Sequence, residues 1–401
     1  MKVAIIHDYI KEFGGAERVL EALTEIFPDA PIYTAFYDRK GTAYEHFKHK
    51  KIIPSWAQNI PFFGSKLHSP LRFLAPFIWG SFKEEFKKYD VIISSASWYV
   101  TKGFGSRCHP EFISGSPANR QAPSRSGEML KPVQHDIKRR PIEICYCHTP
   151  PRWLYGYATS INFQKYPLVR AYAAIVGHFM RLYDFKAAQK VDYFIANSQE
   201  VAGRIKKFYR RDSTVIYPPV SLPKSEIRNP KSEKDYYLIV SRIVGAKGLE
   251  LVIGAAKKMG FKLKIAGSPA GYYSEYKNYS NKDKNIQFLG HVSDAELVNL
   301  YRGAKAFLAI ARDEDFGITP VEAMLMGTPV IAFNGGGYME TVLQSRTGLL
   351  FDDYSVDGLI SAIKQFNNLT INPQDCIAQS QKFGKERFKR EIINFVNSKI
   401  K

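Results

Sequence analysis

Two carboxylates in one short stretch could contact a ligand in this chain of 401 residues. Glu314 and Glu322 lie in 313–327, which reads D-E-D-F-G-I-T-P-V-E-A-M-L-M-G, with a Phe-Gly bend between them. The preceding run, 304–310, is short and apolar, as expected for a strand buried in a parallel sheet. The order strand, acidic loop, helix places both carboxylates where open α/β sheets bind their ligands.

A purely structural explanation of Glu322 is available. Thr319 is a good N-cap, Pro320 suits the first helical position, and Glu322 stands three residues after the cap. These residues predict a capping box, and Gly327 is placed to end the helix. On these residues alone, the simplest role of Glu322 is that of a helix cap.

The N-terminus has a second pattern that suits a charged ligand. A buried strand, V-A-I-I-H-D-Y at 3–9, precedes the loop K-E-F-G-G at 11–15 and a helix over 16–27. A strand, a glycine pair and a helix bring the backbone close to a charged group at the helix N-terminus. The fingerprint G-x-G-x-x-G does not occur here, which counts against a nicotinamide-linked dehydrogenase.

Strands and helices alternate twice along the chain. Strand-like segments lie at 90–95, 142–147, 191–198 and 214–220 in the first half, and at 236–242, 261–267, 286–290, 304–310 and 328–333 in the second. The polar stretch between the halves is typical of a linker. The fold class that this pattern predicts is α/β, with two doubly wound, Rossmann-like domains facing across a cleft.

The expected domain boundaries follow from the same pattern. They are an N-terminal domain at 1–221, a C-terminal domain at 222–384 and a C-terminal helix at 385–401. The periodicity predicts one basic amphipathic helix from roughly Pro373 to Lys401. A segment at 106–136, rich in Pro and Gly, has no sustained periodicity. We expect it to be an inserted, mobile loop.

The composition is that of an ordinary globular protein, with 45% hydrophobic and 24% charged residues. No apolar run approaches the length of a membrane span, and the N-terminus turns polar too soon for a signal peptide, which predicts a cytoplasmic protein. The 4 cysteines do not indicate a disulfide scaffold. Cys145, Cys147 and His148 are only half of a zinc pattern, so we expect no metal there.

The unusual bulk property is the charge, because 57 Lys and Arg against 38 Asp and Glu give a net charge of +19. Such a field attracts nucleic acid, anionic lipid or phosphorylated ligands and does not choose among them. Between His46 and Lys88, basic residues alternate with large aromatic residues, which suits an anionic membrane surface. The same segment could instead be an aromatic core beneath a solvated basic face. The sequence contains no recognised nucleic-acid-binding module.

Several motifs together resemble family 4 of the retaining glycosyltransferases, which have GT-B architecture. They are G-G-A-E-R-V at 14–19, Y-C-H-T-P-P-R-W-L-Y at 146–155, V-S-R-x4-K at 240–247, F-L-G-H-V-S-D-A-E-L at 288–297, E-D-F-G-I-T-P-V-E-A at 314–323, G-G-G-Y-M-E-T-V at 335–342 and T-G-L-L-F at 347–351. The N-terminal motifs resemble in particular the bacterial mannosyltransferase-like members that build surface polysaccharides. The likeness spans nearly the whole chain except the 106–136 insertion.

The resemblance implies roles for these motifs. Arg242 and Lys247 would hold the diphosphate of a nucleotide-sugar donor, because fixed cations stabilise the charge that develops on the leaving group. Glu314 would accept hydrogen bonds from the hydroxyls of the donor sugar, and His148 would contact that sugar. The other implied donor-binding residues are Gly14 and Gly15 near the phosphate or acceptor, His291 and Val292 at the base, the backbone amides of Phe316, Gly317 and Ile318 at the sugar and phosphates, and Glu322 at the ribose.

The resemblance also implies a reaction without a protein nucleophile, in which a donor phosphate oxygen takes the acceptor's proton during front-side attack. Asp313, Glu314 and Asp315 match D-x-D, the metal-binding pattern of the other glycosyltransferase architecture. The loop fits E-x7-E better, and Arg242 with Lys247 can supply the charge of a metal, so we expect no metal and no cofactor. The last helix would cross back to the first domain and take part in closing the cleft.

The expected activity is transfer of a hexosyl unit, with mannosyl favoured, from GDP-mannose to a lipid-linked saccharide at the inner face of the plasma membrane. A sugar phosphorylase or a nucleotide-sugar hydrolase on the same architecture is an alternative. A non-enzymatic basic protein that binds nucleic acid or membrane is a further alternative, although it would leave the carboxylate loop unexplained. We expect an anionic membrane surface as a partner and no nucleic acid.

Overall fold

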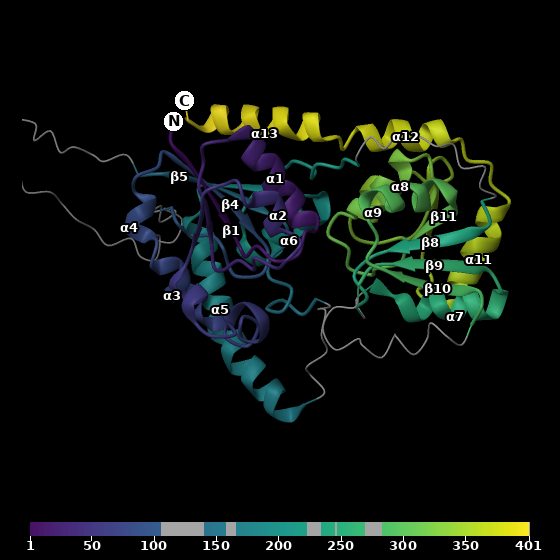
Figure 1. The fold of residues 1–401 in the computed structure, drawn as a ribbon, viewed down its shortest axis with the longest axis horizontal. Coiled ribbons are helices and arrows are strands. Elements are labelled where there is room, and N and C mark those ends of the chain that lie inside the picture. Colours follow the sequence, from purple (N-terminus) through teal and green to yellow (C-terminus); the bar gives the residue numbers. More distant parts are fainter. Residues whose placement is uncertain (106–139, 158–165, 223–233, 245–246, 269–282, 401) are drawn as a thin grey trace, which may run out of the picture.

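The computed structural model describes residues 1–105, 140–157, 166–222, 234–244, 247–268 and 283–400, and shows two α/β domains side by side (Figure 1). The predicted insertion at 106–136 and most of the polar linker lie outside the described residues. Each domain is built on one parallel sheet, so the predicted fold class is confirmed.

The first sheet has seven strands in the order β3-β2-β1-β4-β5-β6-β7, and all of its pairs are parallel. The strands are β1 (Val3–His7), β2 (Ile32–Thr34), β3 (Ile52–Pro54), β4 (Val91–Ala96), β5 (Ile142–Cys147), β6 (Tyr193–Ala196) and β7 (Thr214–Val215). The winding direction changes between β1 and β4, where His7 pairs with Ser95. Ligands bind at such a switch point in open α/β sheets.

The second sheet has six strands in the order β10-β9-β8-β11-β12-β13, again all parallel. They are β8 (Tyr236–Val240), β9 (Lys262–Ala266), β10 (Ile286–Gly290), β11 (Ala304–Ala309), β12 (Val330–Phe333) and β13 (Gly348–Phe351). The switch point lies between β8 and β11. These two strands carry the loops with Arg242 and Glu314 at their carboxyl ends.

The helices cover both sheets. The first domain has α1 (Gly15–Ile26), α2 (Tyr44–Phe47), α3 (Ala75–Gly80), α4 (Lys83–Phe86), α5 (Pro167–Lys190) and α6 (Gln199–Tyr209), with short helices η1 (Trp56–Asn59), η2 (Phe63–Leu67) and η3 (Arg72–Leu74). The rest of the chain forms α7 (Leu249–Met259), α8 (Asp294–Gly303), α9 (Ile318–Leu325), α10 (Tyr338–Thr341), α11 (Val356–Asn367), α12 (Pro373–Gln381) and α13 (Lys385–Ile400).

Strand β7 is shorter than the predicted 214–220. Ile216 still donates a backbone hydrogen bond to the carbonyl of Ala196 at 3.0 Å, but Pro218 and Pro219 follow it. Proline has no N–H for a sheet ladder, so the strand ends before them.

The C-terminal segment is two helices rather than the single helix expected from Pro373 onward. The break falls before α13, where Val220 donates to the carbonyl of Phe383 at 2.9 Å. The two helices lie end to end along one side of the molecule, α12 on the second domain and α13 on the first (Figure 1). The last helix therefore spans back to the first domain.

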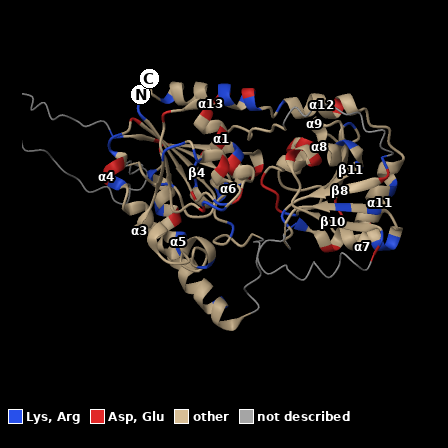
Figure 2. Ribbon diagram, in the orientation of Figure 1, with Lys and Arg blue, Asp and Glu red and all other residues tan. Residues whose placement is uncertain are grey.

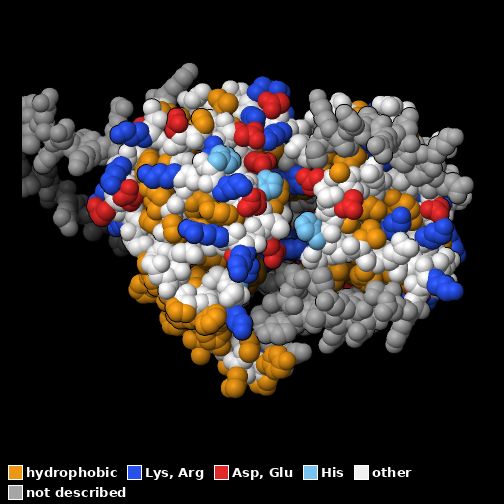
Figure 3. Space-filling model, viewed as in Figure 1, with side chains coloured by type: hydrophobic (Ala, Val, Ile, Leu, Met, Phe, Trp, Pro, Cys, Tyr) orange, Lys and Arg blue, Asp and Glu red, His pale blue; other side chains and the backbone are white. Residues whose placement is uncertain are grey.

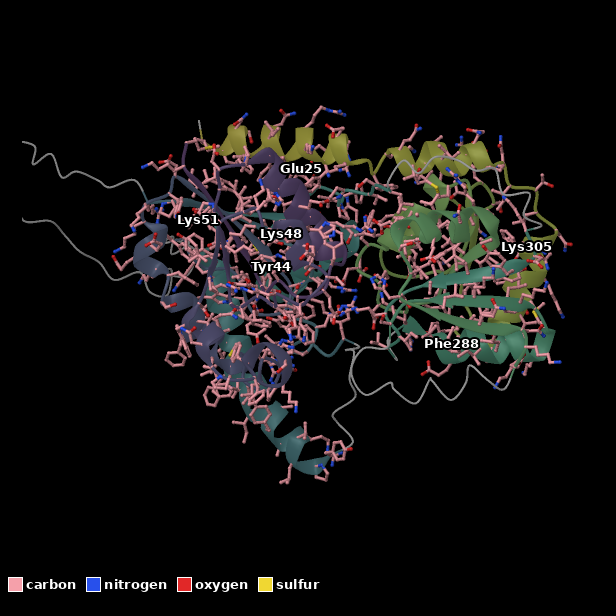
Figure 4. All side chains as sticks on the ribbon, in the orientation of Figure 1. Glu25, Tyr44, Lys48, Lys51, Phe288 and Lys305 are labelled. Atoms are coloured by element: carbon pink, nitrogen blue, oxygen red, sulfur yellow. The ribbon has the colours of Figure 1, made fainter. Side chains whose placement is uncertain are left out.

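Packing and charge hold α13 against α1. Phe388, Ile392 and Val396 recur every four residues and are buried in the core of the first domain. Glu25 of α1 lies beneath α13 (Figure 4) and accepts from Lys385 and, at 2.6 Å, from Lys389. None of the helices in the described part of the chain is long and apolar enough to cross a membrane.

Candidate functional site

The acidic loop between β11 and α9 differs from the predicted capping arrangement. The helix begins one residue before Thr319, and its N-cap is Gly317, with φ of 87°. This left-handed conformation favours glycine, and a Cβ on Gly317 would stand 2.7 Å from the ring of Tyr338. The predicted capping box is therefore wrong, and Glu322 lies inside the helix. Gly327 follows the last turn with φ of 77°, as expected of a glycine that ends a helix.

Glu322 is buried, and both of its carboxylate oxygens have partners. Oε2 accepts from the hydroxyl of Tyr301 at 2.9 Å, and Oε1 lies 3.2 Å from the guanidinium of Arg18. Burial raises the pKa of Glu322, and the charge of Arg18 opposes this rise. Because Arg18 belongs to α1, this ion pair joins the two domains.

Glu314 is held by a lysine from the neighbouring loop. Lys247 Nζ donates to its Oε2 at 2.6 Å, and the hydroxyl of Tyr338 lies 3.3 Å from the same oxygen. Burial acts to raise the pKa of Glu314, but Lys247 and Arg152 more than offset it, so the pKa is lowered overall. The carboxylate is therefore charged at neutral pH and can accept hydrogen bonds.

The loop that carries Arg242 and Lys247 follows β8. Gly248 ends this loop with φ of 68°, and a Cβ there would stand 2.8 Å from the carbonyl oxygen of Ile310. Glycine thus lets the loop approach β11 and brings Lys247 to the acidic loop. Arg242 is exposed, and its charge acts to lower the pKa of Tyr9 in the first domain, against the burial that raises it.

Asp315, the last acid of the loop, contacts two arginines of the first domain. Its Oδ1 lies 2.8 Å from Nη2 of Arg152 and 2.5 Å from Nη1 of Arg204. Arg152 also donates to the carbonyl of Asp313 at 2.5 Å. Acidic and basic residues accordingly meet where the two domains face each other (Figure 2).

Another carboxylate of the second domain, that of Glu340, reaches the start of α6. The oxygens of Glu340 accept from the backbone N–H of Gln199 at 2.8 Å and of Glu200 at 3.0 Å. A carboxylate at a helix N-terminus satisfies free N–H groups and opposes the helix dipole favourably. Sequence reasoning missed this contact, as it missed the roles of Arg18, Arg152 and Arg204.

The first domain contributes His148 and the glycine pair. His148 follows β5, is buried, and its Nε2 lies 2.8 Å from Ser95 Oγ. Burial lowers the pKa of His148 to about 4, so the imidazole is neutral at pH 7. Gly15 starts α1 and faces Ile318 across the domain boundary, since a Cβ on Gly15 would stand 2.8 Å from Ile318 Cδ1.

The remaining predicted residues are placed less directly. Phe316 is buried between the rings of Tyr217 and Phe383, with centroid distances of 5.6 and 5.3 Å. His291 and Val292 follow β10, at the same edge of the sheet as Glu314. No hydrogen bond or ion pair in the described part of the chain joins His291 to that carboxylate.

No group of three or more His, Cys, Asp or Glu that could hold a metal ion occurs among the described residues. Cys145 and Cys147 are buried free thiols, and burial raises their pKa well above the usual thiol value. The carboxylate of Asp315, the last residue of the D-x-D pattern, is already paired with Arg152 and Arg204. The acidic loop is thus arranged as a junction between domains, with one carboxylate facing Lys247 and the next facing the first domain.

The fold and the site together define a two-domain GT-B protein. Residues 223–383 match a family model described as "Glycosyl transferases group 1". Anabaena HepE, solved in complex with UDP and glucose, superposes with a TM-score of 0.66 at 18% identity, over 99% of this chain and 100% of that one. Residues 223–383 are thus similar to the group 1 glycosyltransferases, which supports the resemblance to a glycosyltransferase family that the motifs indicated.

Curated relatives extend the likeness beyond the second domain. The alpha-1,3/1,6-mannosyltransferase ALG2 of Homo sapiens is 27% identical over 302 residues, covering 66% of this chain and 70% of that protein. An uncharacterized glycosyltransferase of Methanocaldococcus jannaschii is 29% identical over 189 residues, 46% of this chain and 53% of that protein. The chain thus spans little more than half the length of some of the relatives that it matches.

Proposed function

We propose that this protein is a retaining glycosyltransferase that moves a mannosyl unit from GDP-mannose to a lipid-linked saccharide in cell-surface polysaccharide synthesis. The observation that carries the proposal is the pairing of Lys247 with Glu314 at the loop junction between the domains. A cation and a charged carboxylate 2.6 Å apart can serve the two ends of one donor, the diphosphate and the sugar. Arg242, which is exposed after the same strand β8, supplies a second cation.

The donor is held from both domains in this proposal. Glu314 accepts from sugar hydroxyls, His148 contacts the same sugar, and Lys247 with Arg242 binds the diphosphate. Glu322 accepts from the ribose, which remains compatible with its two protein contacts because a carboxylate has about four lone-pair positions. The reaction needs no metal, since the two cations stabilise the leaving diphosphate.

A donor screen tests the nucleotide and the sugar. A ligand at 100 times its dissociation constant stabilises the native state by about 2.7 kcal/mol, so GDP-mannose is expected to raise the melting temperature more than UDP- and ADP-sugars. UDP-sugars are the first alternative, because the HepE crystals hold UDP. The absence of saturable binding to any nucleotide sugar, together with tight and salt-sensitive binding to DNA, would contradict the proposal. Product analysis with and without acceptor separates transfer from phosphorolysis and hydrolysis.

We also propose that the first domain docks on the cytoplasmic face of an anionic membrane. Of the aromatic residues between His46 and Lys88, Phe63 and Trp79 are buried, whereas Phe62 is 70% and Phe77 is 67% exposed. Some aromatic residues of this segment thus belong to the core and others lie on the surface, so each of the two interpretations holds for part of the segment. Hydrophobic side chains gather over α3 and the protruding end of α5 (Figure 3).

Helix α5 enlarges this apolar surface. Leu168, Ile175 and Phe179 are each more than 60% exposed, and Phe179 and Ile175 line an apolar groove with Phe73. An exposed apolar surface of this kind beside basic residues suits the interface of an anionic bilayer.

Vesicle binding tests the docking proposal. The triple variant Phe62→Ser, Phe77→Ser, Phe179→Ser should lose at least about tenfold in binding to phosphatidylglycerol-containing vesicles, because each ring contributes about 1.5–3 kcal/mol when buried in an apolar medium. Ile393→Ser, 40% exposed on α13, is the matched control. Equal binding of the triple variant and wild type would contradict membrane docking by this surface.

A further inference from the structure

Four side chains form a hydrogen-bonded chain that ends at His148. Ser95 Oγ lies 2.8 Å from His148 Nε2 and 3.0 Å from His7 Nδ1. The other nitrogen of that ring, His7 Nε2, lies 3.5 Å from Glu17 Oε1. All four residues are buried.

The fold places these residues at the switch point of the first sheet. His7 ends β1 and pairs with Ser95 in β4, and His148 follows β5 with its N–H bonded to the carbonyl of Ala96 at 2.9 Å. Glu17 lies in the first turn of α1, where its Oε2 also accepts from the N–H of Gly14 at 3.0 Å. The hydrogen-bonded series thus connects the glycine loop to His148, two parts of the site that are far apart in the sequence.

The number of protons on these groups fixes which partner donates in each hydrogen bond of the series. The Ser95 hydroxyl has one proton, so it donates to one imidazole and accepts from the other. The Glu17 carboxylate only accepts, so a neutral His7 ring carries its single proton on Nε2 and leaves Nδ1 as an acceptor. Ser95 then donates to His7 and accepts from His148 Nε2–H. In a neutral imidazole this leaves Nδ1 of His148 without a proton.

We propose that Glu17, His7 and Ser95 are positioning residues that hold His148 in one tautomer, so that its Nδ1 accepts a hydrogen bond from a hydroxyl of the transferred sugar. Nδ1 has no hydrogen-bond partner among the described residues. The ring is kept neutral by burial, which lowers its pKa to about 4. This inference rests on the proposed function only for the sugar contact, because the tautomer is a property of the protein alone.

The test has one readout without substrate and one with it. Long-range proton–nitrogen NMR of full-length protein labelled in histidine reports which imidazole nitrogen of His148 carries the proton, with His148→Gln assigning the signal. The wild type should show a protonated Nε2 and a bare Nδ1. Glu17→Gln removes the acceptor-only group, and Ser95→Ala removes the bridging hydroxyl, so both should give mixed tautomers.

The kinetic readout uses the same two variants. Each should lower kcat by about tenfold, the size of one neutral hydrogen bond, with a change of less than about threefold in the KM for the acceptor. Glu21→Gln is the matched control, because Glu21 also lies on α1 and its carboxylate is 3.2 Å from the ring of a histidine, His46. Neither residue belongs to the hydrogen-bonded series. It should leave both kcat and the His148 signals unchanged.

The outcomes separate this inference from the proposed function. A proton on Nδ1 of wild-type His148 would overturn the direction of the chain, whether or not the protein is active. Mixed tautomers in the variants with unchanged kcat would overturn the positioning role while leaving glycosyl transfer intact. If Glu17→Gln does not fold, Ser95→Ala decides alone.

Discussion

Arg18 on α1 and Glu322 on α9 form an ion pair across the two domains, with 3.2 Å between nitrogen and oxygen. The carboxylate is almost fully buried, and Tyr301 donates to its other oxygen at 2.9 Å. A buried charge is tolerated when it is paired and hydrogen-bonded, and removing one partner leaves the other uncompensated. The pair therefore links the residue predicted to bind the ribose with the N-terminal helix that follows the glycine loop.

The first prediction concerns this pair. In a double-mutant cycle with Arg18→Met and Glu322→Gln, the coupling in the free energy of unfolding should be about 1–3 kcal/mol, measured by urea denaturation. The pair Arg346–Asp375, at 3.1 Å and far more accessible to solvent, should couple by less than about 1 kcal/mol in a matched cycle. Equal coupling in the two cycles would mean that the interdomain pair is not retained in solution.

Glu314→Gln should reduce turnover far more than stability. Glutamine keeps one acceptor for Lys247, so the free energy of unfolding should change by less than about 1 kcal/mol, while kcat falls about a hundredfold because the charged acceptor is lost. Steady-state kinetics and urea denaturation provide the two measurements. Asp357→Asn breaks a comparable pair with Lys258, at 2.9 Å on the surface of the same domain, and should affect neither. An unfolded Glu314→Gln protein would return this carboxylate to a purely architectural role.

His148 should make the native state sensitive to acid. Burial, with a smaller contribution from charge on nearby His7, lowers its pKa from 6.5 to about 4, while the charge of Asp8 acts in the opposite direction. Between these two values the unfolded chain binds a proton that the native chain does not, so stability decreases as the pH falls from 6.5 towards 4.

This dependence can be measured as a difference between variants. The stability of wild type relative to His148→Gln should fall by about 2–3 kcal/mol between pH 7.5 and pH 4.5, followed by urea denaturation at each pH. The exposed His49→Gln is the control variant. A constant difference between wild type and His148→Gln over this range would refute the burial of a neutral imidazole.

Activity should survive a chelator. Asp315, the last acid of the D-x-D pattern, lies 2.8 Å from Arg152 and also pairs with Arg204, so its carboxylate is already neutralised by protein groups. Initial rates with and without EDTA should agree within about twofold. Asp315→Asn should lower kcat by weakening the contact between the domains, and added magnesium or manganese should not restore it. Complete loss of activity on EDTA that either ion reverses would contradict this prediction.

Elements with strong periodicity could be predicted from the sequence, and their details could not. The apolar run at 304–310 became β11. The capping box at Thr319 failed because the turn before α9 is set by Gly317, whose left-handed backbone fits against Tyr338. That packing involves a residue 21 positions away from Gly317, which no local pattern reports.

The site shows the same division. The resemblance to family 4 implies that Lys247 and Glu314 act on one ligand, and the structure places them 2.6 Å apart. Their direct ion pair was not expected. Arg152 and Arg204 were missed because their partner, Asp315, belongs to the other domain, and the sequence carries no signal for a contact between residues more than 100 positions apart.

The sequence by itself determined the alternation of strands and helices, the positions of the candidate residues at strand ends, and the likeness to family 4. These depend on local periodicity and on short motifs. Only the tertiary structure decided which charges meet: Arg18 with Glu322, Asp315 with two arginines, and His148 with Ser95 and His7. Hydrogen bonds and ion pairs act over a few ångströms in space, and only the packing of the domains brings such distant residues within that range.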